Sequence, residues 1–273
     1  MPSSTQSRKT LVSKGIRDIE KAVRAGLGDR GNTLPWRRTH DPYAIFVSEI
    51  MLQQTGVERV IGKYETFLRT FPSWKKLAGA SLEEVLTLWV GLGYNRRARS
   101  LHEAARAVSG RRGGFPKDPA HIEELPGAGS YTAAAVATFA FNTPTVFIET
   151  NIRTVFLYHC FQGKKNVHDS AILPLVARSL RGKNPRRWYT ALMDYGAYLK
   201  KQGVRVNTKS AHYTKQNKFE GSARQLRGAI IRLYVAGEPL TPSVIAKRFG
   251  KKRGQVEREI GRLTREGLLS GNR

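Results

Sequence analysis

The sequence predicts an all-α protein, and three observations support this class. Apolar residues recur at helical spacing along much of the chain, as Ile16, Ile19 and Val23 illustrate. Gly, Pro or Ser residues separate the helical segments at short intervals, as is typical of helix ends. Strict alternation of apolar and polar residues, which would indicate strands, is nearly absent before the last few residues.

The expected helices follow one another from the N-terminus to residue 201. After a first helix that ends near Gly26, they are expected around residues 44–54, 57–71, 81–90 and 96–108, then in a hairpin at 125–141, and then at 151–162, 169–181 and 186–201. Residues 202–220 are polar and irregular, which favours a linker or a loop that follows a nucleic-acid backbone.

The C-terminal segment has a pattern of its own. Helices are expected at 222–236, from Thr241-Pro242 to Gly250, and at 252–266, because Thr at the N-cap and Pro at the first position begin helices well. Three helices with a tight turn before the last resemble a helix-turn-helix with a truncated wing. A cluster of cations at the turn and the third helix supports DNA contact over a bundle used only for packing: Lys247, Arg248, Lys251, Lys252 and Arg253.

The charge of the chain indicates a polyanionic partner. Its 273 residues include 47 Lys and Arg against 21 Asp and Glu, a formal net charge of +26. Residues 200–273 alone hold 18 basic and 5 acidic residues. Such a surface binds nucleic acid favourably, because neutralised phosphates release counterions. Charge by itself does not separate DNA from RNA, the ribosome or an anionic membrane.

Cysteine usage and hydropathy exclude several classes. Cys160 is the single cysteine, which excludes an internal disulfide and any multi-cysteine metal cluster. It is interpreted as a small buried residue. No apolar stretch approaches 18 residues, and the first residues lack a signal-peptide core. An intracellular, soluble protein without metal, cofactor or membrane partner is therefore expected.

The segment from Leu125 to Ala133 is the sharpest local motif. Gly127 and Gly129 allow a tight turn directly before a helix. Backbone N–H groups at a helix start bind phosphate, and the helix dipole adds to this. The turn resembles the hairpin of helix-hairpin-helix proteins, which grip DNA phosphates without reading sequence. Gly127, Gly129, Tyr131 and Thr132 are the candidate phosphate-binding residues.

Glu49 is a candidate general acid. Its expected helix also carries the apolar residues Ile45, Phe46, Ile50 and Met51. A carboxyl group that is partly desolvated has a raised pKa and can donate a proton at neutral pH. A solvated helix position is the alternative interpretation.

At this point the chain resembles the helix-hairpin-helix DNA glycosylases of the HhH-GPD superfamily, and within them the MutY-type adenine glycosylases. The matching segments occur in family order and with family-like spacing: Leu34–Arg37, Asp41–Tyr43, Ser48–Thr55, Leu88–Tyr94, Leu125–Ala134 and Met193–Ala197. The resemblance implies a two-lobed, all-α glycosylase fold, here followed by the helix-turn-helix.

The resemblance also implies roles for individual residues. Glu49 matches the acid that protonates the leaving adenine. Base-pocket and wedge positions match Trp36, Arg37, Leu52, Gln54 and Tyr94. Tyr131 stands where bifunctional relatives carry a lysine nucleophile, which implies a monofunctional, hydrolytic enzyme. A core aromatic of the hairpin is the alternative for Tyr131.

The chain departs from the family at the carboxylate that stabilises the sugar cation. The family has an aspartate that begins an Asp-Gly-Asn-Val run, whereas this chain has Glu149-Thr150-Asn151-Ile152. Asn151 fits, but the carboxylate of Glu149 is one methylene longer, and such reactions are sensitive to misplacement. A rearranged but active pocket, a changed substrate and a binding-only protein are the three interpretations, in that order.

Two further departures concern the region after Asp194. Where many relatives have four cysteines for an iron–sulfur cluster, this chain has Lys200 and Lys201, so no cluster is expected and phosphate contact would depend on charge. The C-terminal domain that recognises 8-oxoguanine in MutY-type enzymes is replaced by the basic helix-turn-helix.

Three domains and one leading function follow. Residues 1–34 with 142–220 are expected to form a cluster-less helical lobe with a basic linker, residues 35–141 a six-helix lobe with the hairpin motif at 125–134, and residues 222–273 a DNA-binding domain. The expected function is a monomeric, cytoplasmic, nucleoid-associated DNA glycosylase that flips a mispaired or damaged base, adenine first, from duplex DNA. Thymine or uracil opposite guanine, a deaminated base, or a non-catalytic DNA-binding protein are the alternatives.

Overall fold

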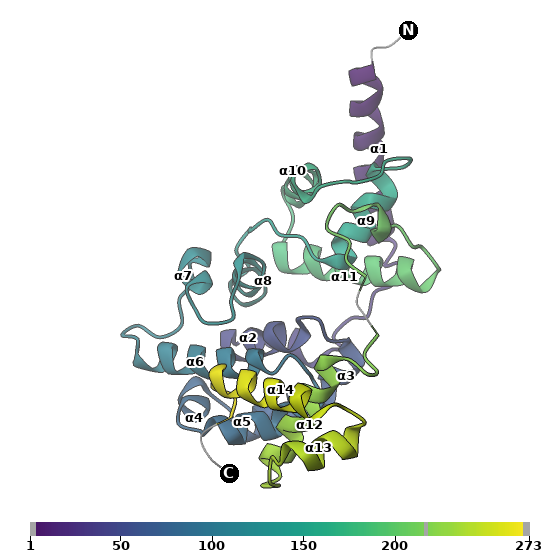
Figure 1. The fold of residues 1–273 in the computed structure, drawn as a ribbon. Coiled ribbons are helices and arrows are strands. Elements are labelled where there is room, and N and C mark those ends of the chain that lie inside the picture. Colours follow the sequence, from purple (N-terminus) through teal and green to yellow (C-terminus); the bar gives the residue numbers. More distant parts are fainter. Residues whose placement is uncertain (1–3, 216–217, 270–273) are drawn as a thin grey trace. The chain divides into compact units, whose positions relative to one another are not determined.

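The computed structural model describes residues 4–215 and 218–269, and within them the chain is helical (Figure 1). Fourteen α-helices and two single-turn 3₁₀-helices occur in the described residues, which contain no strand and one isolated bridge, between Val167 and Ser210. The predicted all-α class is confirmed. The chain divides into two compact units, Met1–His40 with Ser130–Lys215 and Asp41–Gly129 with Gln216–Arg273.

The first unit is built around one central helix, α9. Its elements are α1 (Ser4–Arg24), η1 (Pro35–Arg37), α8 (Ser130–Phe141), α9 (Thr150–Cys160), α10 (Asp169–Leu180), α11 (Pro185–Lys201) and η2 (Asn207–Lys209). Helices α1, α10 and α11 all pack against α9. The apolar residues Ile152, Val155 and Phe156 of α9 are fully buried, because three helices cover this helix.

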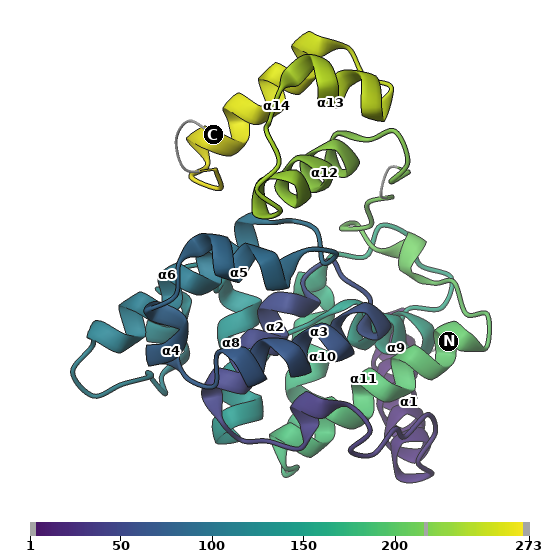
Figure 2. The same ribbon diagram turned by 90° about the horizontal axis from the view of Figure 1, so that it is seen from below.

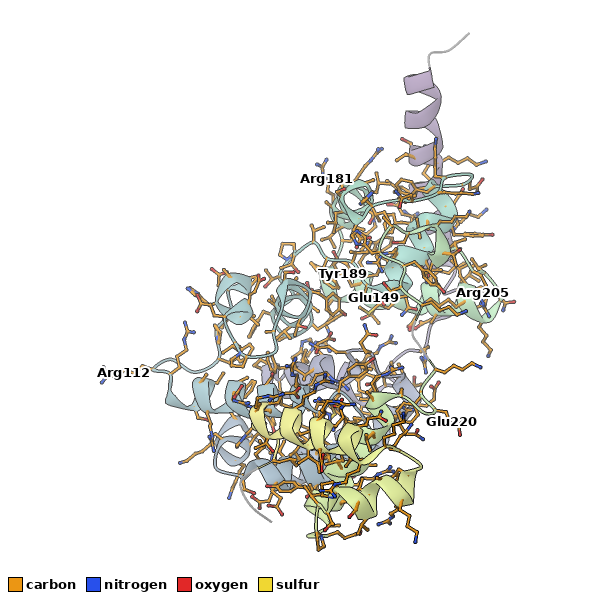
Figure 3. All side chains as sticks on the ribbon, in the orientation of Figure 1. Arg112, Glu149, Arg181, Tyr189, Arg205 and Glu220 are labelled. Atoms are coloured by element: carbon orange, nitrogen blue, oxygen red, sulfur yellow. The ribbon has the colours of Figure 1, made fainter. Side chains whose placement is uncertain are left out.

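Two contacts position the segment that leads into α9. The rings of Phe147 and Tyr189 stack with their centres 4.0 Å apart. The Tyr189 hydroxyl donates to the Thr145 carbonyl at 3.0 Å and accepts from the Phe147 N–H at 3.3 Å. Tyr189 and Glu149 are both labelled in Figure 3, where they lie close to each other in this unit. Helix α11 therefore holds the chain directly before Glu149.

The second unit contains six helices from the middle of the chain and three from its C-terminal part. The first six are α2 (Pro42–Leu52), α3 (Val57–Thr70), α4 (Trp74–Ala78), α5 (Leu82–Trp89), α6 (Arg96–Gly110) and α7 (Pro119–Glu123). Helix α6 packs against α2, α4 and α5. Helix α2 buries nine of its eleven residues, since it is apolar on every side.

The C-terminal helices α12 (Ala223–Val235), α13 (Pro242–Phe249) and α14 (Arg253–Arg265) form the expected three-helix arrangement. Gly250 ends α13 in the left-handed conformation, at a φ of 61°, which only glycine adopts without strain. Helix α12 packs on α5, as Figure 2 shows, and α14 packs on α12 and α13. No wing strand occurs up to residue 269, and residues 270–273 lie outside the described residues.

Glu266, directly after α14, connects the C-terminal helices α12–α14 to α6 through ion pairs and a hydrogen bond. Its carboxylate pairs with Arg227 of α12 and lies 3.3 Å from Nε of Arg96. Its backbone carbonyl accepts a hydrogen bond from Arg99. Several arginines thus converge on one residue, so the C-terminal helices belong to the same compact unit as α2–α7.

This grouping differs from the division expected from the sequence at two places. Helix α8 clusters with the first unit, although the lobe boundary was expected at residue 141. The C-terminal helices cluster with the second unit rather than by themselves. That the three segments expected from the sequence are separate domains remains a prediction.

Candidate active site

Glu49 lies in the buried helix α2 and is 6% exposed. Asp41 caps this helix by accepting a hydrogen bond from the Tyr43 N–H at 3.0 Å, and Pro42 occupies its first turn. The fully buried Phe46 and Ile50 lie one turn before and one residue after Glu49. Glu49 is therefore buried among buried apolar neighbours along the helix, which excludes the alternative of a solvated helix position.

Arg97 of α6 anchors the end of α2. Its Nη1 donates to the carbonyls of Ile50 and Met51, both at 2.8 Å, and its Nη2 donates to the Gly93 carbonyl at 2.9 Å and the Thr55 hydroxyl at 3.0 Å. Burial lowers the pKa of this guanidinium to about 10. Sequence analysis missed Arg97, because nothing distinguishes it from its neighbouring arginines along the chain.

Arg97 joins the two loops that carry wedge candidates. Gln54 and Tyr94 have φ values of 57° and 47°, a conformation that residues other than glycine rarely adopt. Such strain gathers at functional sites when the surrounding structure holds it in place. Both side chains are exposed, Tyr94 to 42%, whereas Leu52 at the end of α2 is half-buried.

The turn before α8 requires one of its two glycines. Gly127 has a φ of 84°, and a Cβ there would lie 2.9 Å from Cβ of Ser100. The Gly127 carbonyl accepts a hydrogen bond from the Gln53 amide at 3.2 Å. The expectation that Gly129 is also needed for the backbone conformation is wrong, because its φ is not positive and a Cβ would meet nothing within 4 Å. Phosphate binding by this turn remains a prediction.

Helix α8 begins directly after the turn and carries Tyr131 and Thr132. Tyr131 is half-buried and meets the Phe147 ring edge to face, with centres 5.6 Å apart. The Thr132 side chain is buried, so the backbone N–H of Thr132 is the group that remains a candidate at this position.

Glu149 caps the N-terminus of α9. Its Oε1 accepts hydrogen bonds from the N–H groups of Asn151 and Ile152, both at 2.8 Å. Burial raises the pKa of this carboxyl group, while these two hydrogen bonds and the charges of Lys200 and Arg153 act in the opposite direction. Asn151 also accepts a hydrogen bond from Nζ of Lys200 at 2.7 Å, so three sequence-predicted residues meet here.

Arg37 is held in an ion pair that sequence analysis did not foresee. Its guanidinium contacts both carboxylate oxygens of Asp194, at 2.8 and 2.6 Å, and the side chains are 12% and 3% exposed. Arg37 lies in η1 beside the half-buried Trp36. The base-pocket roles of both residues remain predictions, and the Arg37 guanidinium already has a structural partner.

The predicted phosphate-binding cations of the C-terminal helices differ in their surroundings. Arg248 pairs with Glu238 at 2.9 Å, Arg253 pairs with Glu257 at 2.7 Å, and Lys251 donates to the Gly221 carbonyl at 2.8 Å. Lys247 and Lys252 are exposed, as is Lys201 in the first unit. The exposed lysines are therefore the best placed of these candidates to meet a phosphate.

A family profile described as "HhH-GPD superfamily base excision DNA repair protein" matches residues 47–172, which include Glu49, the hairpin turn and Glu149. This match covers 126 of the 273 residues and supports the superfamily to which the sequence motifs pointed. The resemblance drawn from the sequence motifs is confirmed.

Curated relatives that resemble this chain are adenine DNA glycosylases. The chain is 36% identical over 173 residues to the adenine DNA glycosylase of Buchnera aphidicola subsp. Baizongia pistaciae, covering 61% of this chain and 48% of that protein. It is 44% identical over 132 residues to the human adenine DNA glycosylase, covering 45% and 24%. The chain thus spans about half or less of the length of these relatives.

Two solved structures have similar folds. A thermostable thymine-DNA glycosylase is 28% identical with a TM-score of 0.56, over 71% of this chain and 88% of that one. A trapped endonuclease III–DNA covalent intermediate is 18% identical with a TM-score of 0.52, over 83% and 95%. The second likeness concerns the fold alone.

The residues of this chain do not fit a four-cysteine iron–sulfur cluster. Cys160 is the only thiol of the chain, and burial raises its pKa to about 12. Across 4–215 and 218–269, no three His, Cys, Asp or Glu side chains gather as metal ligands. Among the same residues no helix is long and apolar enough to span a membrane.

Proposed function

We propose that this chain is a monofunctional DNA N-glycosylase that flips a mispaired or damaged base from duplex DNA and hydrolyses its N-glycosidic bond. Adenine is the first candidate base. The observation that carries the proposal is the burial of Glu49, which is 6% exposed, in the apolar helix α2. A carboxylic acid held beside a leaving base can donate the proton that the base accepts.

The reaction needs two groups with opposite tasks. The bond between C1′ and the base nitrogen breaks with its electron pair going to the base, and Glu49 supplies the proton that this nitrogen system accepts. The sugar becomes an oxocarbenium-like cation, which an ionised carboxylate stabilises. Glu149 is the candidate for this second task. Water then adds to C1′ and loses a proton, which leaves a free base and an abasic site.

Tyr131 supports a hydrolytic rather than a lyase mechanism. A phenol cannot form a Schiff base with the abasic sugar, so strand cleavage through a protein amine at this position is not expected. The exposed Tyr94 and Gln54, both in strained loop conformations, are the candidate wedge that holds the base stack open.

Thymine or uracil opposite guanine is the second candidate substrate. The thermostable thymine-DNA glycosylase, the solved structure of higher identity among those described above, favours it.

A panel of duplexes, each with one adenine, thymine, uracil or deaminated base in a defined mispair, tests the proposal. We expect alkali-labile abasic sites for at least one of these, and we expect Glu49→Gln to abolish them while DNA affinity changes less than about threefold. Glu58→Gln, on an exposed residue of α3, is the matched control. Binding without cleavage across the whole panel would make the chain a non-catalytic DNA-binding protein.

The cellular setting follows from the proposed substrate. We propose that the protein acts as a monomer on lesion-containing or mispaired duplex DNA, inside the cell and associated with the nucleoid. It is proposed to work without a metal or cofactor, because acid catalysis and cation stabilisation are both tasks for carboxyl groups. Light scattering during size exclusion, with and without a 20-base-pair duplex, tests the monomer.

A further inference from the structure

Lys200, near the C-terminus of α11, contacts Asn151, whose backbone N–H binds the Glu149 carboxylate. It is the penultimate residue of α11, and its Nζ donates a hydrogen bond to Oδ1 of Asn151 at 2.7 Å. The backbone N–H of the same Asn151 donates to Oε1 of Glu149 at 2.8 Å. One asparagine therefore connects the ammonium group to the carboxylate.

Close packing of α11 on α9 makes this contact possible. Gly196 of α11 lies against the backbone of Asn151, where a Cβ would come within 2.2 Å of the Asn151 carbonyl oxygen. Lys200 follows one turn later on the same face of the helix. Residues with a side chain at position 196 would hold α11 away from the start of α9, and Lys200 would lose its reach.

Of the two cations near Glu149, one is paired with another carboxylate and the other is not seen paired with one among the described residues. Lys200 and Arg153 are the two cations of the described first unit whose fields act on this carboxylate. Arg153 is already paired with Asp169, at 2.6 Å between Nη2 and Oδ2. Lys200 instead donates to the neutral Asn151 amide. Burial lowers the pKa of Lys200, and the charge of Glu149 opposes this shift.

We propose that Lys200 is a positioning residue for Glu149, which holds Asn151 at the start of α9 and supplies the positive charge that favours the ionised carboxylate. This role of Lys200 rests on the proposed function, in which Glu149 must be ionised to stabilise the sugar cation. In this chain Lys200 stands where many relatives begin their cluster cysteines, so one lysine contact would order this junction where a cluster is chemically impossible.

The pH profile of base excision tests the charge. Ionised Glu149 is needed for activity, so its protonation produces the acid limb of the profile. Lys200→Met raises the pKa of Glu149, so we expect the ratio of activity at pH 6 to activity at pH 8.5 to fall about three- to tenfold. Lys200→Arg should retain most of that ratio. Lys164→Met, an exposed lysine after α9, should leave it unchanged.

The pH dependence of unfolding tests the same contact without any enzymatic activity. Because burial raises the folded-state pKa of Glu149, the stability this group contributes is complete below its unfolded pKa and is lost as pH rises through the folded value. Without Lys200 this loss should be larger. We therefore expect Lys200→Met to lower the denaturation midpoint more at pH 8 than at pH 4, and this pH dependence to disappear in a Glu149→Gln background.

The two measurements separate the proposals. If no base is excised but the pH-dependent coupling of Lys200 and Glu149 is present, the proposed function fails and the positioning role stands. If excision occurs with the same acid limb in Lys200→Met and wild type, and unfolding shows no coupling, the positioning role is overturned.

Discussion

Arg224, in the first turn of α12, donates a hydrogen bond from Nη1 to the hydroxyl of Tyr94 at 2.9 Å. Its guanidinium carbon lies 5.8 Å from the centre of the same ring, and that of Arg97 lies 5.5 Å from it. The exposed tyrosine is thus flanked by two guanidinium groups, one from α6 and one from the C-terminal helices. Cations over aromatic rings contribute about 0.5–1 kcal/mol at exposed sites.

Arg224→Met should weaken binding to a duplex with an abasic-site analogue about three- to tenfold, because Tyr94 then loses a contact that orders it before binding. Fluorescence anisotropy at fixed salt measures the affinity. Arg232→Met, an exposed arginine of the same helix, is the control. In a Tyr94→Ala background the effect should vanish, and an equal loss there would mean that Arg224 contacts DNA directly.

Arg37→Ala should destabilise the protein by about 3–5 kcal/mol, because it leaves the buried carboxylate of Asp194 without its charged partner and with only the Arg30 N–H as a donor among the described residues. The double variant Arg37→Met with Asp194→Leu should recover much of this loss. Denaturant titration measures both, with Arg187→Ala, an exposed arginine of α11, as the control. A stable Arg37→Ala protein that excises no base would instead make Arg37 a base-pocket residue.

Gly196→Ala should lower the free energy of unfolding by about 1–3 kcal/mol or more, since the added methyl group overlaps the Asn151 carbonyl. Gly228→Ala in α12 is the matched control, because a Cβ there meets nothing within 4 Å. A helical Gly→Ala exchange without a clash should stabilise by up to about 1 kcal/mol. If Gly196→Ala stabilised the protein as much as Gly228→Ala, the close packing of α11 on α9 at Asn151 would be contradicted.

In a plot of log affinity against log salt concentration, the double variant Lys247→Gln with Lys252→Gln should have a slope that is smaller in magnitude by about one to two. This is the change expected if each lysine neutralises one phosphate. Lys75→Gln with Lys76→Gln on α4, also exposed, serves as the control pair. Substitution is preferable to deletion of residues 222–273, because α12 covers α5 and its removal would expose that face. An unchanged slope would exclude these two lysines from the DNA contact.

Local patterns predicted most of the helices. The ends expected near Gly26, Gly250 and Gly267 agree with those of α1, α13 and α14 to within about two residues, because glycine in a left-handed conformation ends a helix wherever it occurs. Helices α4 and α7, of five residues each, were missed. Segments so short carry too few apolar positions to show a period.

Part of the candidate site could also be predicted. Glu49 and Glu149 stand out because each lies in a recognisable run of residues, and the structure buries the first and places the second at a helix start. Arg97 and Arg224 could not be found in this way. Their partners lie up to 47 and 130 residues away along the chain, and nothing in the local sequence specifies those distances.

The helical class, the family resemblance, the two candidate carboxylates and the impossibility of a four-cysteine cluster follow from residue type and short-range spacing. The contacts of Arg37 with Asp194, of Lys200 with Asn151 and of Arg224 with Tyr94 appear only in the folded chain. Such contacts depend on which helix faces pack together, and the desolvation that shifts the pKa of a carboxyl group exists only once they have packed.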